Sequence, residues 1–252
     1  MKNISILFSV IIFFVAAQVQ ISYADTFIKI PCPIYKKGDI LKYRTQKGNS
    51  ISTFQLVVKS VTRDTIQLVS NSNSSSHGQN IDTLIVLTKK GDTLYLVKTI
   101  ANINGMQAVN TFRPPEPICG NIPSRYSYKT TIINKSMSQT LLVLNNKVTV
   151  SKVGDKQLNT PLGNLKTVVI KKVCEMTGGD NFVNTTITSI TYNANKYGKV
   201  KELTTTVMKM PDYSSMAQNI PQQPQKNVNS NIIGKDVSII DLINYKTLKK
   251  EK

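Results

Sequence analysis

The sequence predicts an all-β protein, with a curved antiparallel sheet that forms a barrel or half-barrel. Two observations support this fold class. From Thr26 to Lys209, apolar and polar residues alternate with period two, in runs rich in Val, Ile, Thr and Tyr. Turn-forming sequences such as Lys90-Gly91-Asp92 separate these runs at intervals of roughly ten residues. Such alternation is typical of strands that have one buried face and one wet face.

The first element is a secretory signal peptide at residues 1–24. Lys2 provides a basic start, an apolar run covers 4–17, and small residues stand just before the expected cleavage site between Ala24 and Asp25. The alternative is a membrane anchor, but the apolar run is shorter than the ~20 residues needed to cross hydrocarbon. No later segment is apolar enough to span a membrane. We therefore expect an exported chain, periplasmic or secreted, with no transmembrane segment after cleavage.

The alternating runs define the strands that follow the signal. Those around 165–176 and 182–193 are long enough to curve. We expect strands at 39–45, 52–59, 65–70, 82–88, 93–100, 126–133, 140–144, 147–153, 165–176, 182–193 and 199–208. Asn145-Asn146 is expected to be a turn.

The three cysteines allow one internal disulfide and leave one free thiol. Cys32 stands in Pro-Cys-Pro, and Cys119 follows a Pro-rich stretch, so both lie in stiff, irregular segments. Cys174 lies inside an apolar run, where a lone thiol behaves as a small hydrophobic side chain. We therefore favour a disulfide between Cys32 and Cys119, although either could pair with Cys174.

The sequence is compatible with two domain organisations, either one β domain over 25–210 or two similar β units. Two hairpins, around 81–98 and 187–203, have similar sequences, but unrelated hairpins also resemble one another. With two units, the expected segments are a signal peptide at 1–24, a first β unit at 25–112, a Pro-rich connector at 113–118, a second β unit at 119–210, a flexible linker at 211–231 and a basic C-terminal helix or tail at 232–252.

A short helix is predicted at the C-terminus. Asp236 or Ser238 could cap it, and the lysines that follow suit the negative end of the helix dipole. Its apolar residues could contact a partner or pack against the protein's own sheet. The possible contact residues are Ile239, Ile240, Leu242 and Ile243.

The net charge points to anionic partners. The 32 Lys and Arg residues against 14 Asp and Glu give a formal charge of +18. An excess of this size favours an anionic envelope polymer, lipid or envelope protein, whereas a chain without Trp has few side chains on which to stack nucleic-acid bases. The alternative is that lysines such as Lys166, Lys172, Lys199 and Lys201 simply cover the wet faces of strands and protect sheet edges.

No catalytic, cofactor-binding or metal-binding residues are predicted. The single histidine, His77, stands in a Ser-rich loop, and neither a nucleophile elbow, a phosphate-binding loop nor a CxxC pair occurs. The sequence leaves open a catalytic pair of carboxylates, as in glycosidases, that only folding would bring together. We therefore expect a protein that is not an enzyme and that has no cofactor.

Three motifs resemble those of exported, periplasmic all-β proteins of bacterial envelopes. They are a Gly-x-x-x-x-Tyr strand at 38–43, a Thr-Pro-x-Gly turn formed by Thr160, Pro161 and Gly163, and a Gly-x-Val-Lys strand at 198–201. The first motif departs from that group, because Leu41 replaces the usual aromatic residue. The resemblance implies a curved antiparallel sheet in the bacterial envelope and implies no activity.

These observations lead to one main hypothesis and two alternatives. The main hypothesis is a non-enzymatic envelope protein that binds an apolar or anionic ligand, or a protein partner, on the concave side of its sheet. The first alternative is a structural or assembly component of an envelope or secretion complex. The second is a hydrolase whose site follows no recognisable motif. A ligand carrier requires a continuous apolar cavity, which a fully filled sheet interior would not provide.

Overall fold

The computed structural model describes residues 26–74, 79–103, 106–135, 137–178, 183–209 and 232–247. The predicted signal peptide, with Ala24 and Asp25, lies outside the described residues, as does the predicted linker at 211–231. The described residues contain thirteen strands and no helix. Within these ranges, therefore, no helix has the length and apolarity needed to cross a bilayer.

The described residues form thirteen strands in chain order. They are β1 (Phe27–Ile30), β2 (Ile40–Lys47), β3 (Ser50–Val61), β4 (Thr65–Ser74), β5 (Gln79–Lys90), β6 (Thr93–Ile103), β7 (Met106–Pro123), β8 (Arg125–Asn134), β9 (Gln139–Thr160), β10 (Gly163–Gly178), β11 (Val183–Ala194), β12 (Gly198–Lys209) and β13 (Ile232–Lys246). The all-β prediction is confirmed, and most predicted strands coincide with observed ones.

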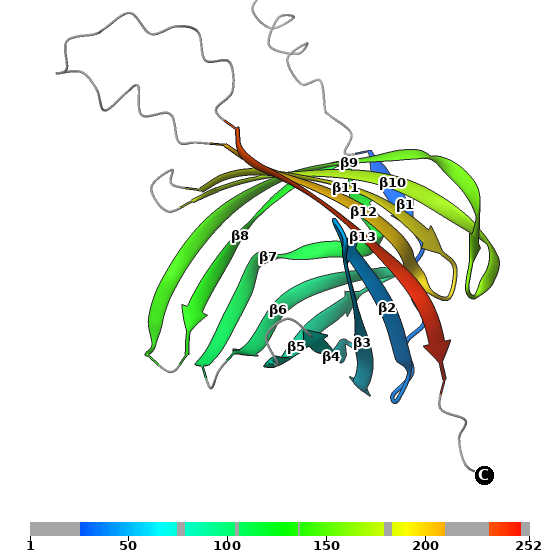
Figure 1. Cartoon of the computed structure of the whole chain (residues 1–252), viewed down its shortest axis with the longest axis horizontal. Helices are drawn as coiled ribbons and strands as arrows, with labels where there is room; N and C mark the ends of the chain where they lie inside the picture. Colours follow the sequence, from blue (N-terminus) through cyan, green and yellow to red (C-terminus); the bar gives the residue numbers. More distant parts are fainter. Residues whose placement is uncertain are drawn as a thin grey trace, which may run out of the picture.

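The sheet is antiparallel and closes into a barrel (Figure 1). Each strand from β2 to β12 pairs with its neighbour in sequence, and β13 lies between β12 and β2. Closure comes from the pairing of β7 with β8, in which Ala108 faces Asn134 and Arg113 faces Lys129. The strands of the two expected β units thus share one continuous sheet, and the Pro-rich stretch 113–118 lies within β7.

Alternation along the strands separates an inner and an outer face. On β9, Asn146, Val148 and Val150 are buried, whereas the residues between them are exposed. The expected turn at Asn145-Asn146 is wrong, because Asn146 points inward and remains in the ladder. Its amide donates hydrogen bonds to the Thr130 hydroxyl at 3.1 Å and to the Tyr128 carbonyl at 3.3 Å. An inward-pointing Asn can lie within a strand when its polar atoms have partners in this way.

The C-terminal segment forms strand β13, so the predicted helix is wrong. The backbone of β13 pairs on both sides, with Ile240 facing Glu202 of β12 and Leu242 facing Tyr43 of β2. The segment is rich in Ile and Val, which favour strands, and it fills the space between two strands that would otherwise have open edges. The four apolar residues predicted to make contacts therefore differ in burial. Leu242 is buried, Ile239, Ile240 and Ile243 are half-buried, and Ile243 falls at a register shift.

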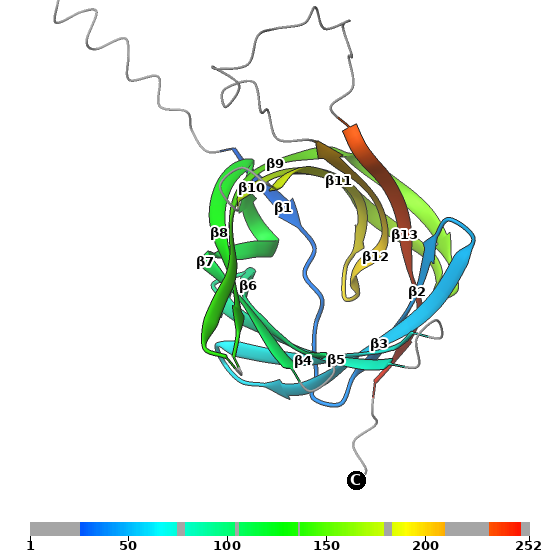
Figure 2. The same ribbon diagram turned by 60° about the vertical axis from the view of Figure 1, so that its left-hand side comes forward.

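Beta-strand β1 and the residues after it run across the inside of the ring (Figure 2). Strand β1 pairs only with the last part of β7, from Phe27 facing Pro123 to Ile30 facing Gly120. Gly120 has a φ of +99°, and a Cβ there would lie 2.4 Å from the Asp92 carbonyl oxygen. Because any larger residue would collide with the β5–β6 turn, this glycine allows the last part of β7, which pairs with β1, to lie against that turn.

The role of β13 in the barrel can be tested on two of its side chains. Leu242 is 1% exposed and Val237 is 50% exposed. We expect Leu242→Ala to lower the free energy of unfolding by about 2–5 kcal/mol because it leaves a cavity in packed surroundings. Val237→Ala, on the same strand, should cost less than about 1 kcal/mol. Urea denaturation measures both, and equal costs would contradict the packing of β13.

Candidate functional site

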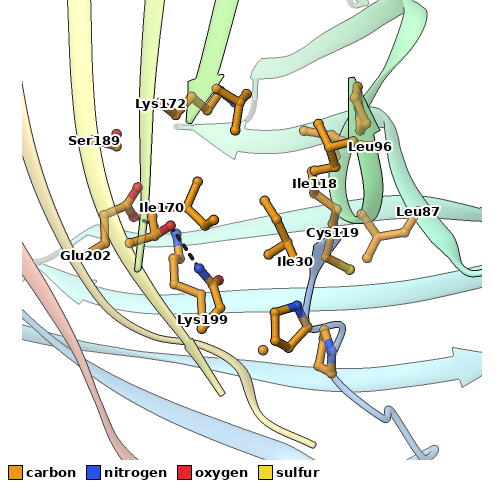
Figure 3. A pocket seen from close by; sticks show the side chains of 18 of the residues that line it. Ile30, Leu87, Leu96, Ile118, Cys119, Ile170, Lys172, Ser189, Lys199 and Glu202 are labelled. Atoms are coloured by element: carbon orange, nitrogen blue, oxygen red, sulfur yellow. Dashed lines mark hydrogen bonds and ion pairs between the residues drawn. The ribbon is translucent and has the colours of Figure 1, made fainter. Parts of the chain in front are cut away.

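The barrel encloses a cavity with a volume of about 470 Å³, called here the inner cavity. All of the strands from β1 to β12 contribute residues to its wall. The wall is mainly apolar, as Figure 3 shows for Ile30, Leu87, Leu96, Ile118 and Ile170. Its volume falls within the roughly 300–1,000 Å³ range of small-molecule sites, which are also mostly apolar with a few polar groups.

The apolar wall is not fully packed by the protein's own side chains. Ile118 lines the cavity yet is 37% exposed, and Leu96 and Ile187 are only half-buried. An apolar side chain on an inner face is normally buried against its neighbours. These residues therefore face open space, and an apolar ligand could cover them.

A buried polar cluster lies within this wall. The Lys172 ammonium group on β10 forms an ion pair with the Glu116 carboxylate on β7, whose side chain is 9% exposed. Burial is the largest single influence on the pKa of Lys172 and lowers it, but the charge of Glu116, the charge of Tyr126 and the hydrogen bond to Glu116 together outweigh burial, so the pKa is raised overall. Burial raises the pKa of Tyr126 to about 12 and also raises the pKa of Tyr128. At neutral pH the cluster thus holds one ion pair and two protonated phenols.

Cys174, the free cysteine, joins the same cluster. It is buried and lines the inner cavity, with its sulfur 3.8 Å from the Asn146 side-chain oxygen. Burial is the largest influence on its pKa, which is raised. A protonated, buried thiol is a poor nucleophile, so its position fits the small hydrophobic role expected from the sequence.

A second polar group stands on β11 and β12. The Lys199 ammonium group lies 2.5 Å from the Glu202 carboxylate, and Ser189 lies near them on the cavity wall (Figure 3). Like Lys172 and Glu116, this pair has no net charge. The inner cavity therefore offers hydrogen-bonding groups without a net charge in either ion pair.

One end of the inner cavity is covered by residues 30–35, called here the crossing segment. Cys32 in this segment is joined to Cys119 of β7 by a disulfide, with the two Cα atoms 5.2 Å apart. The backbone N–H of Ile34 donates a hydrogen bond of 3.1 Å to the Lys196 carbonyl. Gly198 permits this approach, since a Cβ there would lie 2.7 Å from the Pro33 ring. The segment is thus attached to both sides of the barrel.

A second cavity, of about 500 Å³, also has the crossing segment in its wall and is called here the outer cavity. Its wall includes three cationic side chains, Lys29, Arg63 and Lys89, and one acidic side chain, Asp92. Residues 62–64 and 91–92 form the β3–β4 and β5–β6 turns, so this cavity lies at the end of the barrel where these turns gather.

The site residues predicted from the sequence do not lie together in the structure. Cys32 and Cys119, the favoured pair, form the disulfide at the inner cavity. Thr160 and Gly163 flank the two-residue β9–β10 turn, where the Thr160 hydroxyl donates a 2.9 Å hydrogen bond to the Gly163 carbonyl. Together with Pro161, Thr160 lines only a small pocket of about 140 Å³, away from the inner cavity. Gly163 has a φ of +103°, which suits glycine.

Sequence reasoning missed the polar cluster. Lys172 is expected on a wet face, but it lines the inner cavity with Ile170 and Cys174, two positions away on either side. Residues two positions apart on a strand point to the same face, so the apolar neighbours Ile170 and Cys174 could have indicated that Lys172 points inward. Glu116 gave no signal, because its Pro-rich neighbourhood hid the strand that carries it inward. Among the described residues, no three His, Cys, Asp or Glu side chains gather as metal ligands.

Comparison with known proteins gives no family assignment. Neither a family model nor a curated protein sequence matches the chain. Among solved structures, the complex of Pseudomonas aeruginosa MucA and MucB matches at 7% identity, covering 80% of this chain and 87% of that chain with a TM-score of 0.19. A structure of MucB in complex with MucA(peri) matches at 8% identity, covering 81% and 87%, also with a TM-score of 0.19. Scores this low support no conclusion about fold or function.

The disulfide should fix the crossing segment. It joins residues 87 positions apart, and closing a loop of this length contributes about 4.6 kcal/mol in the chain-entropy model. We expect the Cys32→Ser/Cys119→Ser variant to lose stability of that order in urea denaturation. Alkylation of the denatured wild-type protein without reductant should label Cys174 alone. Labelling at Cys32 or Cys119 would show that the disulfide is absent.

The buried ion pair can be tested by removing one or both charges. Lys172→Met leaves the Glu116 carboxylate buried without its cation, and we expect a loss of about 3–5 kcal/mol. The double variant Lys172→Met/Glu116→Leu should recover most of this loss, because no unpaired charge remains. Urea denaturation at pH 7 measures both. A single variant as stable as wild type would contradict the burial of the pair.

Proposed function

We propose that this protein is an exported, non-enzymatic binding protein that holds an apolar ligand inside its barrel. The observation that carries the proposal is the inner cavity, whose wall is apolar and incompletely packed. A carrier requires such a cavity, whereas a purely structural sheet protein has no need to leave it empty of side chains. Larger barrels commonly enclose ligand cavities in this way.

The polar groups of the wall fit a role in orienting the ligand. Lys172, Ser189 and Glu202 line the cavity from the three neighbouring strands β10, β11 and β12, and they offer both donors and acceptors. A few convergent polar groups on an otherwise apolar wall fix the orientation of a bound molecule. The same groups are placed to hydrogen-bond a hydroxyl or an ester that an otherwise apolar ligand carries.

Export and the bacterial envelope remain part of this proposal on the strength of the sequence. The signal-like segment 1–24 and the disulfide both suit an oxidising compartment. The alternative role in an assembly complex rested on a tethered C-terminal helix. Because that segment is barrel strand β13, no observation now favours the alternative.

Ligand binding can be tested with an uncharged apolar fluorophore, N-phenyl-1-naphthylamine. Ile118 lines the inner cavity and is 37% exposed, whereas Val143 is 41% exposed and is absent from the cavity wall. We expect Ile118→Trp to fill the cavity and weaken binding at least tenfold, or about 1.4 kcal/mol. Val143→Trp should leave the affinity within about twofold of wild type.

Native mass spectrometry of the purified protein provides the second readout. The wild-type protein should retain co-purified apolar molecules that Ile118→Trp lacks. Equal fluorophore binding by the two Trp variants, together with the absence of any bound mass in the wild type, would overturn the proposal.

A further inference from the structure

The crossing segment contributes to the walls of both cavities. Ile30, Pro31, Pro33 and Tyr35 belong to the walls of both. The inner wall is mostly apolar, and Figure 3 shows Ile30 lying between Ile170 and Ile118 of the inner cavity. A molecule that reaches past this segment therefore meets both the apolar inner cavity and the outer cavity.

The outer cavity is cationic. Lys29 comes from β1, Arg63 from the β3–β4 turn and Lys89 from the end of β5, so three separate elements place positive charge around one space. In the described part of the chain, none of these three side chains forms an ion pair. Asp92 is the one carboxylate in this wall, so cations outnumber it.

Further positive charge surrounds the same end of the barrel. Lys90 follows Lys89, and Lys196 lies in the β11–β12 turn, beside the crossing segment that it hydrogen-bonds through its carbonyl. Charges of one sign around a concavity add to one another and attract anions. The inner cavity offers no comparable attraction, because Lys172 is neutralised by Glu116.

From this arrangement we infer that the ligand is an amphiphile with an anionic headgroup. Its apolar chain lies in the inner cavity, and its phosphate or carboxylate lies in the outer cavity against Lys29, Arg63 and Lys89. The inference rests on the proposed function, because it assigns the second half of the same ligand.

The test compares two lipids that differ in the headgroup charge. 1-Oleoyl lysophosphatidic acid and 1-oleoylglycerol share one acyl chain, and only the first carries a phosphate. We expect wild-type protein at low salt to bind the phosphate-bearing lipid at least tenfold more tightly, measured by displacement of N-phenyl-1-naphthylamine. The preference should shrink as salt is added, because the cations are exposed to solvent.

Charge reversal locates the headgroup. Lys29→Glu/Arg63→Glu/Lys89→Glu should abolish the preference while leaving the affinity for 1-oleoylglycerol within twofold. The matched control Lys147→Glu/Lys166→Glu/Lys171→Glu makes the same change of charge at exposed positions of β9 and β10 that line neither cavity, and it should keep most of the preference. Thermal melting checks that both variants fold.

The outcomes separate this inference from the proposed function. If neither lipid binds the wild type, the proposed function fails. If both bind equally, or if the control reversal removes the preference as fully as the outer-cavity reversal does, the headgroup site is wrong while the apolar site stands. Displacement of the lipid by inorganic phosphate alone at equal concentration would show a site for free phosphate and overturn the amphiphile.

Discussion

Closure of the sheet is the constraint on which the other features of this protein depend. The pairing of β13 with β2 joins the two ends of the strand series, and the pairing of β7 with β8 completes the ring. Closure gives every strand a fixed inner and outer face and leaves no free edge in the ring. Eight strands make a barrel just wide enough for side chains to fill, and this ring has twelve. Its interior is therefore wide enough to contain more than its own side chains.

That extra width contains three things: the crossing segment, the polar cluster and the inner cavity. The crossing segment supplies apolar contacts from Ile30 and is anchored by the disulfide of Cys32. The polar cluster is satisfied internally, since Lys172 and Glu116 neutralise one another. An unpaired charge at this depth would be strongly destabilising, so the two residues act as a unit. The remaining space is the inner cavity, whose wall is mainly apolar and whose ion pairs carry no net charge.

The inner and outer cavities differ in the net charge of their walls, and the proposed ligand rests on that difference. The sequence left open whether the protein binds an apolar ligand, an anionic ligand or a protein partner. In the folded chain the apolar surface lines the inner cavity, whereas Lys29, Arg63 and Lys89 line the outer cavity. A single amphiphile satisfies the first two alternatives, because one end of it suits each cavity. The crossing segment belongs to the walls of both cavities.

The sequence alone determined the local features, because strand alternation and turn chemistry act between neighbouring residues. It predicted an all-β antiparallel fold, most of the strands, the disulfide partners Cys32 and Cys119 and the burial of Cys174. Only the tertiary structure decided that 232–246 is a strand, because its helix-like spacing was overridden by backbone partners on β2 and β12. It also decided that Lys172 lies inside, beside Glu116. Closure, cavity and ion pair all join residues far apart in the chain, and no local pattern specifies which distant partner each will meet.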